Sequence, residues 1–204
     1  MRLADNGQLV YKYNELVKTA KIVAKDELEF ELFVDAVNHL SIAKYCNPQK
    51  ESLEKKGFID VNFYRFFVDE EKIKIDFTFL YIISKETFDT FINFARAINF
   101  KFPVIISDFI KSENLMIEIV SKKYQYEDND DKKSNIIIES VYNMNNISIK
   151  NFISELTKTF ESYYDFILEK TYVKINKDIA QMTNKQALLN FQKKHEFYSN
   201  GMIY

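Results

Sequence analysis

The sequence predicts an α+β protein with an antiparallel sheet of about five strands and helices packed on it. Two observations support this class. Apolar residues repeat at helical spacing near both ends of the chain, whereas between residues 58 and 81 they alternate as in strands. Short polar turns separate the strand segments, and strands joined by short turns run antiparallel. The expected order of elements is α-α-β-β-α-β-β-β-α-α.

The first part of the chain is expected to be helical. Residues 1–10 are predicted to fray, and the apolar spacing that follows predicts a helix over about 11–25. Asp26 is a candidate N-cap for a second helix over about 27–45, where a strand-like alternation is the competing interpretation. Pro48 should end that helix, because the residue before a proline is pushed away from helical backbone angles.

The clearest hairpin follows Gly57, where the apolar period changes to two. One face of its first strand is predicted to carry Ile59, Val61, Phe63, Arg65 and Phe67, and the other face Phe58, Asp60, Asn62, Tyr64 and Phe66. The polar residues 68–71 form the expected turn, and residues 73–81 form the second strand.

The rest of the chain is predicted to alternate between helix and strand before ending in helices. The expected elements are a helix over about 84–99, strands over 102–110, 115–126 and 136–142, a polar loop over 127–134, and helices over about 148–170 and 184–197. Thr183 is expected to cap the last helix in a capping box with Gln186. No boundary is apparent, so residues 1–204 are expected to form one domain, with 172–204 as a C-terminal helical extension.

Composition argues against several kinds of site. The chain has three glycines, each isolated, whereas a P-loop or a dinucleotide-binding turn needs clustered glycines. The single cysteine, Cys46, excludes an intramolecular disulfide and a zinc site built on cysteine pairs. No apolar run approaches the ~18 residues of a membrane span, and the N-terminus lacks an apolar signal core. We therefore expect a cytoplasmic protein without a cofactor or membrane partner.

No catalytic group stands out in the sequence. His39 and His195 are far apart, and each is explained as an ordinary helix histidine. Cys46 follows the end of a predicted helix, which is the wrong end of the helix dipole for activating a thiol. Asp60 and Asp76 lie on successive strands and could pair at a metal, but solvated carboxylates are the simpler interpretation. No metal site is expected.

The predicted hairpin carries aromatic residues on both faces, which suggests a surface for a partner. If helices cover one face only, aromatic side chains on the other face are exposed, and such patches mark interaction surfaces. The alternative is that helices cover both faces. The partner-binding candidates are Phe58, Tyr64 and Phe66 on the hairpin and Tyr124 and Tyr126 beside the polar loop.

Lysines near the C-terminus form the second candidate surface. Net charge is −2 and only three of the 28 basic residues are arginine, the side chain best suited to reading phosphate and guanine. The nucleic-acid candidates are Lys170, Lys174, Lys177, Lys185, Lys193 and Lys194. A solvated helix face is the simpler interpretation of them.

Three functions remain open. The favoured one is a non-enzymatic protein-binding module, such as a chaperone, adaptor, inhibitor or immunity protein, that uses the aromatic sheet face or an edge strand; it could also form a homo-oligomer. The element order is similar in outline to that of small secretion-chaperone-like α+β folds, in which a sheet and flanking helices cradle a partner or dimerise. The alternatives are a nucleic-acid-associated accessory protein and an enzyme with dispersed carboxylates.

Overall fold

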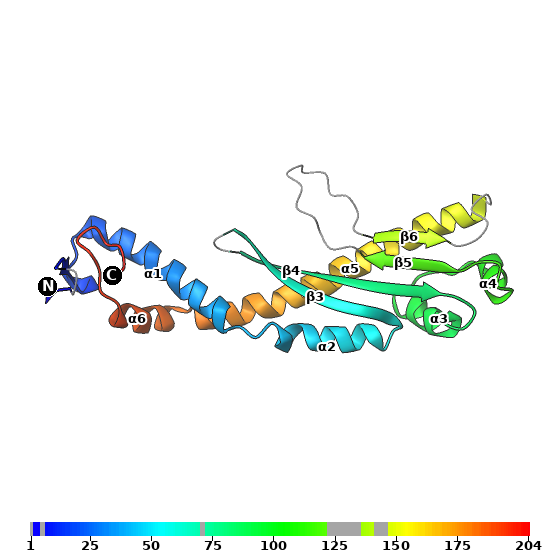
Figure 1. Cartoon of the computed structure of the whole chain (residues 1–204), viewed down its shortest axis with the longest axis horizontal. Coiled ribbons are helices and arrows are strands. Elements are labelled where there is room, and N and C mark those ends of the chain that lie inside the picture. The colour runs from blue at the N-terminus through cyan, green and yellow to red at the C-terminus, as the bar shows by residue number, and fades with distance from the viewer. Residues whose placement is uncertain (1, 5–6, 70–71, 122–135, 141–146) are drawn as a thin grey trace. The chain divides into compact units, whose positions relative to one another are not determined.

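The computed structural model describes residues 2–4, 7–69, 72–121, 136–140 and 147–204, with backbone only at 65–69, 72–74, 139–140 and 147–148. Within these residues the chain is α+β, with six helices and two antiparallel sheets (Figure 1). The predicted class is therefore confirmed. The predicted single sheet of about five strands is wrong, because the described strands form one sheet of two strands and one of four.

The chain divides into two compact units. The terminal unit comprises Met1–Ser41, Asp69–Lys72 and Val173–Tyr204, and the sheet unit comprises Ile42–Val68 and Ile73–Tyr172. Composition does not change at these boundaries, which explains why the sequence predicted one domain. The residues from Val173 onward, where the sequence predicted a C-terminal helical extension, pack with the N-terminal segment in the terminal unit.

The N-terminal residues are paired in the terminal unit. Strands β1 (Arg2–Leu3) and β2 (Leu9–Val10) form an antiparallel pair, and Val10 is only 1% exposed. Tyr11 then bridges Phe197 by two backbone hydrogen bonds of 2.8 and 2.9 Å. The sequence predicted fraying over residues 1–10, whereas in the structure these strands pair with each other and the residue after them, Tyr11, pairs with the far end of the chain.

One long helix replaces the two predicted in this region. After the 3₁₀ turn η1 (Tyr13–Glu15), helix α1 runs from Lys18 to His39 without interruption. Its buried residues recur at fourth positions: Ala20, Ala24, Leu28, Leu32 and Ala36. This stripe passes through the region of Asp26, which lies exposed in mid-helix instead of capping a new helix. Continuous packing of one helical face therefore outweighed the local capping signal.

Helix α2 (Ala43–Glu54) begins the sheet unit and contains Pro48 in its interior. The expectation that this proline ends a helix is wrong. Proline removes one helical hydrogen bond, but the helix buries Cys46 before it and Gln49 and Leu53 after it. Gly57, with φ of 93°, follows the helix and leads into the sheet, as the sequence indicated.

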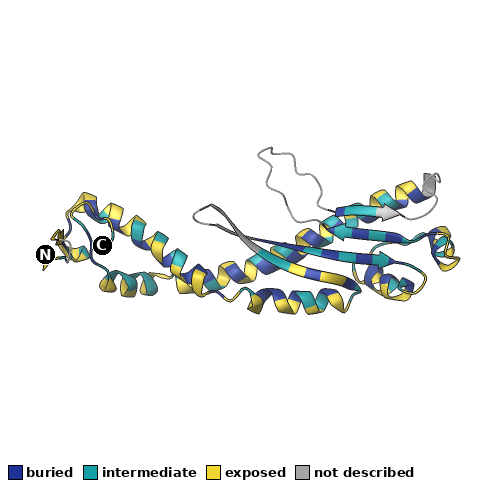
Figure 2. Ribbon diagram, viewed as in Figure 1, coloured by how far each residue is buried: buried dark blue, intermediate teal, exposed yellow. Residues whose placement is uncertain are grey.

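The sheet unit is built on four strands in the order β3-β4-β5-β6. The predicted hairpin is confirmed as β3 (Phe58–Asp69) and β4 (Lys72–Ile83), followed by β5 (Ile117–Ser121) and β6 (Ile136–Ser140). Tyr81 lies opposite Ile119, which lies opposite Ile138, so these residues form one cross-strand row. Buried and half-buried residues alternate from Phe77 to Ile83 of β4 and along β5 (Figure 2), as expected where one face meets a core.

Helices α3 (Phe88–Ala97), α4 (Val104–Lys111) and α5 (Ile147–Met182) supply the core of the inner sheet face. Aromatic rings fill much of it. Phe58, for example, makes edge-to-face contacts with Tyr81 and Phe94 at centroid distances of 4.8 and 5.3 Å. Such contacts add to the hydrophobic stabilisation of the burial itself.

Two predictions in the second half of the chain are wrong. The strand predicted over 102–110 is helix α4, because Ile106 and Ile110 are buried four positions apart and a short apolar run does not distinguish the two structures. The break predicted at 172–176 is absent, since α5 continues to Met182 with Ile175 fully buried.

The last helix, α6 (Lys185–Lys194), is capped one residue later than predicted. The side chain of Asn184 accepts hydrogen bonds from the backbone N–H groups of Gln186 and Ala187. Thr183 instead donates its hydroxyl proton to the carbonyl of Ile179, in the last turn of α5. Asn184 is therefore the N-cap, a role for which its side chain is well suited.

Candidate functional site

The aromatic sheet face predicted from the hairpin is only partly present. Phe58 is 1% exposed and lies in the core, so its assignment to an exposed face is wrong. The reason is local: Asp60 has a φ of 52°, in the left-handed region, which interrupts the alternation along β3. Ile59 and Asp60 therefore both face outward between the buried Phe58 and Val61.

The outer face of the four-stranded sheet carries an apolar row that the hairpin analysis missed. Leu80, Val120 and Ile137 lie opposite one another on β4, β5 and β6 and are all half-buried. None of them is part of the core that helices α3, α4 and α5 build on the inner face. Side chains on adjacent strands cover one another only partly, so half-burial is expected on a sheet face that no helix covers.

Of the other aromatic candidates, Tyr64 is the one that the structure places beside this row. It is half-buried, and its hydroxyl lies 3.4 Å from that of Thr78 on β4. The side chain of Phe66 is outside the described part of the structure, as are Tyr124 and Tyr126 entirely. A role for these aromatic residues in binding a partner stays a prediction.

The six candidate lysines are all exposed: Lys170, Lys174, Lys177, Lys185, Lys193 and Lys194. Three of them, Lys170, Lys174 and Lys177, lie on α5, and the other three lie on α6. The ammonium of Lys170 is 5.9 Å from the centroid of the Phe166 ring, a cation–π contact. Lys193 and Lys194 occupy the last turn of α6, where cations favour the helix dipole.

Among the described residues, no group of His, Cys, Asp and Glu is arranged to hold a metal ion. His39 is exposed beside Asp35, and His195 stacks on Phe191 at a centroid distance of 4.2 Å. Burial raises the pKa of the Cys46 thiol to about 11, so little reactive thiolate forms at neutral pH. The geometry at these residues therefore gives no support to covalent or metal-assisted catalysis.

Asp60 and Asp76, the two acids predicted on successive strands, differ in their surroundings. Asp60 is exposed, whereas Asp76 is 3% exposed and accepts a 2.7 Å hydrogen bond from the backbone N–H of Phe77. A carboxylate that accepts a backbone hydrogen bond is explained by that structural role. The pair therefore gives no support to a metal site.

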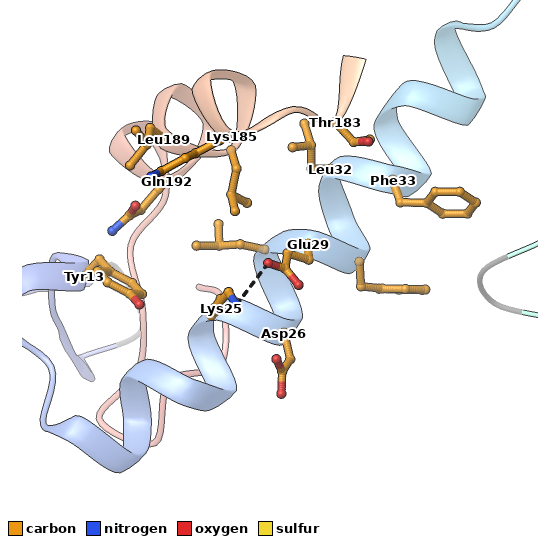
Figure 3. Close-up of a pocket in the computed structure, with 13 residues that line it drawn as sticks. Tyr13, Lys25, Asp26, Glu29, Leu32, Phe33, Thr183, Lys185, Leu189 and Gln192 are labelled. Carbon is orange, nitrogen blue, oxygen red and sulfur yellow. Dashed lines mark ion pairs between the residues drawn. The ribbon is translucent and has the colours of Figure 1, made fainter. Parts of the chain in front are cut away.

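The candidate site is a groove in the terminal unit, between α1 and α6, with a volume of about 980 Å³. Its floor is apolar, with Leu28 and Leu32 from α1 and Leu188 from α6. Leu189 stands at its edge and is 41% exposed. Both helices line the groove (Figure 3). Leu28 and Leu32 are themselves buried, so its accessible apolar surface comes from the half-buried Phe33 of α1 and from Leu188 and Leu189 of α6.

Charged side chains stand on both walls of the groove. On α1, Lys25 forms a 3.5 Å ion pair with Glu29, while Asp26 is exposed without an ion pair among the described residues. On the α6 wall, Lys185 extends toward α1 (Figure 3). The walls thus carry opposite net charge, and charged groups around an apolar floor favour one orientation of a bound segment.

Helix α6 makes few buried contacts, so it can move away from α1 and widen the groove. It contains no buried residue, and only its half-buried Leu188 and Phe191 pack against the core of the terminal unit. Elements with few buried apolar contacts open at low free-energy cost. The sequence holds a signal for this groove in the apolar residues of α1 and α6, but not for the pairing of the two helices.

No family model, curated protein or solved structure matches this chain. Its function therefore has to be inferred from its own residues and surfaces. None of the helices in the described ranges is both long enough and apolar enough to cross a membrane. What the described surfaces offer is an apolar groove between two helices and an apolar row on a sheet face, both suited to binding rather than to chemistry.

Proposed function

We propose that this chain is a non-enzymatic protein-binding module whose α1–α6 groove receives the apolar face of a helix from a partner protein. The observation that carries the proposal is the groove itself, about 980 Å³ in volume, whose accessible apolar surface comes from Phe33 of α1 and from Leu188 and Leu189 of α6. Amphipathic helices bind other proteins in grooves of this kind, with apolar anchors at helical spacing.

The dimensions of the groove favour a short helical segment. On α1 its lining extends from Lys25 to Phe33, a rise of roughly 12 Å along the helix axis. Two turns of a partner helix cover that length and bring two or three apolar side chains over the floor. A helix is a fitting occupant because it would pack between α1 and α6 as a third member of a small bundle.

The charges on the walls define the partner further. A helix that carries a basic residue toward Asp26 and an acidic residue toward Lys185 would complement both walls. Such charges set orientation and association rate, whereas the buried apolar side chains supply most of the affinity. The partner is therefore expected to carry an aliphatic stripe flanked by charges of both signs.

The outer sheet face supports the same class of function through a different surface. Its row of Leu80, Val120 and Ile137 suits a flat apolar partner. A nucleic-acid-associated role has less support, because net charge is −2 and only three of the 28 basic residues are arginine. An enzyme with dispersed carboxylates has none in the arrangement of the described acids.

Site-specific photo-crosslinking tests the proposal. A photoreactive amino acid at Gln192, on the groove wall, should crosslink a protein in the native host, whereas the same group at Lys177, exposed elsewhere in the terminal unit, should not. A peptide covering the crosslinked segment is then titrated against the purified chain. We expect a helical signal on binding, because the free peptide is too short to be helical alone.

Two matched variants decide whether the groove is the site. Leu189→Asp places a charge at the groove, and Met202→Asp places one at a residue of similar exposure, 48%, in the same unit but outside the groove lining. We expect the first to weaken peptide binding at least tenfold, as loss of an apolar anchor does, and the second to leave it unchanged. Equal effects of the two, or crosslinks to nucleic acid alone, would overturn the proposal.

A further inference from the structure

A second pocket lies in the sheet unit, between α3 and α4, and it is separate from the groove described above. Its volume is about 470 Å³, within the range of small-molecule sites, roughly 300–1,000 Å³. Its apolar lining comes from Phe88 and Ile92 of α3 and from Phe100 and Phe102 of the segment that leads into α4. Phe88 and Phe102 meet edge to face at a centroid distance of 5.6 Å. The pocket therefore has an aromatic floor.

Two cations stand in the lining of this pocket. Arg96 belongs to the last turn of α3 and Lys111 to the last turn of α4, and both are exposed. Neither forms an ion pair within the described residues, although Lys111 lies 5.3 Å from the centroid of the Phe88 ring. Favourable interaction with the helix dipole accounts for a cation in a last turn, but not for two of them in one pocket.

The remaining polar groups limit the charge of a ligand. Asp89, in the first turn of α3, also lines the pocket and would repel a second negative charge. Ser107 of α4 is half-buried in the lining and has a hydroxyl to donate. This combination favours a ligand with a single negative charge over a phosphate dianion.

The apolar surface at the mouth of the pocket is extensive. Val104, which lines the pocket, is 78% exposed, and its neighbour Ile105 is 51% exposed. An apolar ligand that covers Val104 would remove this surface from water and gain free energy in proportion to the area buried.

We propose that the α3–α4 pocket binds a monocarboxylate with an aliphatic chain, such as a medium-chain fatty acid. The chain lies against Phe88, Phe100 and Phe102, and the carboxylate is held by Arg96 and Lys111. Arginine is suited to this role because its guanidinium donates two parallel hydrogen bonds to a carboxylate. The site is independent of the groove in the terminal unit and remains if that groove proves not to bind a helix.

Calorimetric titration of the full chain with hexanoate, octanoate and decanoate tests the proposal. We expect the affinity to rise about fourfold for each methylene added, because each buried methylene contributes the hydrophobic free energy of its surface. Decanol and decyl phosphate report on the head group. Both should bind more weakly than decanoate. Decanol lacks the negative charge, and Asp89 repels the second negative charge of decyl phosphate.

Two variants with a matched control locate the head group. Arg96→Gln should weaken decanoate binding at least tenfold and leave decanol binding unchanged, since only the carboxylate uses the guanidinium. Lys101→Gln, an exposed cation outside the pocket lining, is the control and should bind decanoate like the parent chain. Asp89→Asn should raise the affinity for decyl phosphate selectively.

Three results would overturn the proposal. One is an affinity for the carboxylates that does not change with chain length. Another is equal loss of decanoate binding in Arg96→Gln and Lys101→Gln, which would indicate general charge attraction. The third is tighter binding of a short peptide with an apolar C-terminal residue than of decanoate, which would make the site a reader of peptide C-termini. Thermal melting of each variant checks that it is folded.

Discussion

Arg2 and Glu196 are 194 positions apart in the sequence, yet the guanidinium of Arg2 donates two hydrogen bonds to the carboxylate of Glu196. The ammonium of Lys12 lies 3.1 Å from the other carboxylate oxygen. Glu196 is 7% exposed, and although desolvation raises its pKa, hydrogen bonds from Lys12 and Arg2 outweigh that effect and hold the pKa below its usual value. This cluster joins the two ends of the chain within the terminal unit.

Glu196→Gln should therefore destabilise the terminal unit. The pKa of Glu196 is lower in the folded state than in the unfolded state, so its stabilisation is present above the unfolded pKa, about 4.3, and is lost as pH falls through the folded value. Urea unfolding of parent and variant at pH 7 and near pH 3 measures both effects. The two proteins should differ at pH 7 and converge in acid.

Glu29→Gln is the control for this prediction. It removes an exposed i,i+4 pair with Lys25, and such pairs contribute only about 0.3–0.5 kcal/mol. If Glu196→Gln changed stability no more than Glu29→Gln does, the cluster would have no special role in joining the chain ends.

Gly201→Ala should be strongly destabilising. Gly201 has a φ of 98°, and a Cβ atom added there would stand 2.2 Å from the backbone oxygen of Ala20 on α1. The strain of a left-handed alanine costs about 1–2 kcal/mol, and the clash with rigid helix backbone adds to it. Gly7, with a φ of 78° and nothing within 4 Å of its added Cβ, is the matched control.

Denaturant midpoints of Gly201→Ala and Gly7→Ala separate the two effects. The Gly7 variant should lose only the free energy of backbone strain. The Gly201 variant should lose at least about 1 kcal/mol more, because α1 has to move to admit the methyl group. Equal losses would show that the C-terminal segment does not approach α1 as closely as the structure describes.

Two adjacent residues of β5 test whether helices cover only one sheet face. Ile119 is fully buried on the inner face, and Val120 is half-buried on the outer face. Ile119→Thr should cost about 2–3 kcal/mol, since it leaves a cavity and buries a hydroxyl in an apolar core. Val120→Thr should cost less than about 1 kcal/mol. Similar losses, measured by chemical unfolding, would mean that the outer face is covered as well.

Tyr81→Phe should stabilise the sheet unit. The hydroxyl of Tyr81 is buried without a hydrogen-bond partner among the described residues, and such a group is unfavourable by about 1–3 kcal/mol. Tyr172→Phe should have the opposite effect, because the Tyr172 hydroxyl accepts a hydrogen bond from the N–H of Ile75 and donates one to its carbonyl. Thermal melting of the two variants should show shifts of opposite sign. A loss of stability in Tyr81→Phe would indicate a hydrogen-bond partner for its hydroxyl.

Local sequence patterns determined the secondary structure wherever one physical signal stood alone. The hairpin of β3 and β4 follows from strict alternation, and α3 follows from apolar residues at helical spacing. The same patterns misled where two signals competed. Asp26 signals the start of a helix and Pro48 the end of one. Each nevertheless lies inside a helix, because burial of the neighbouring residues outweighs the local preference.

The candidate sites depended on contacts that no local pattern contains. The sequence alone established the α+β class, the isolated glycines and the single cysteine, and with them the kinds of site that its composition argues against. Only the tertiary structure decided that α1 pairs with α6 to form a groove and that Arg96 and Lys111 line the same pocket. The physical reason is that the spacing of apolar residues determines whether their own segment forms a helix or a strand. Which faces of these elements stay exposed is determined by how segments distant in the sequence pack together.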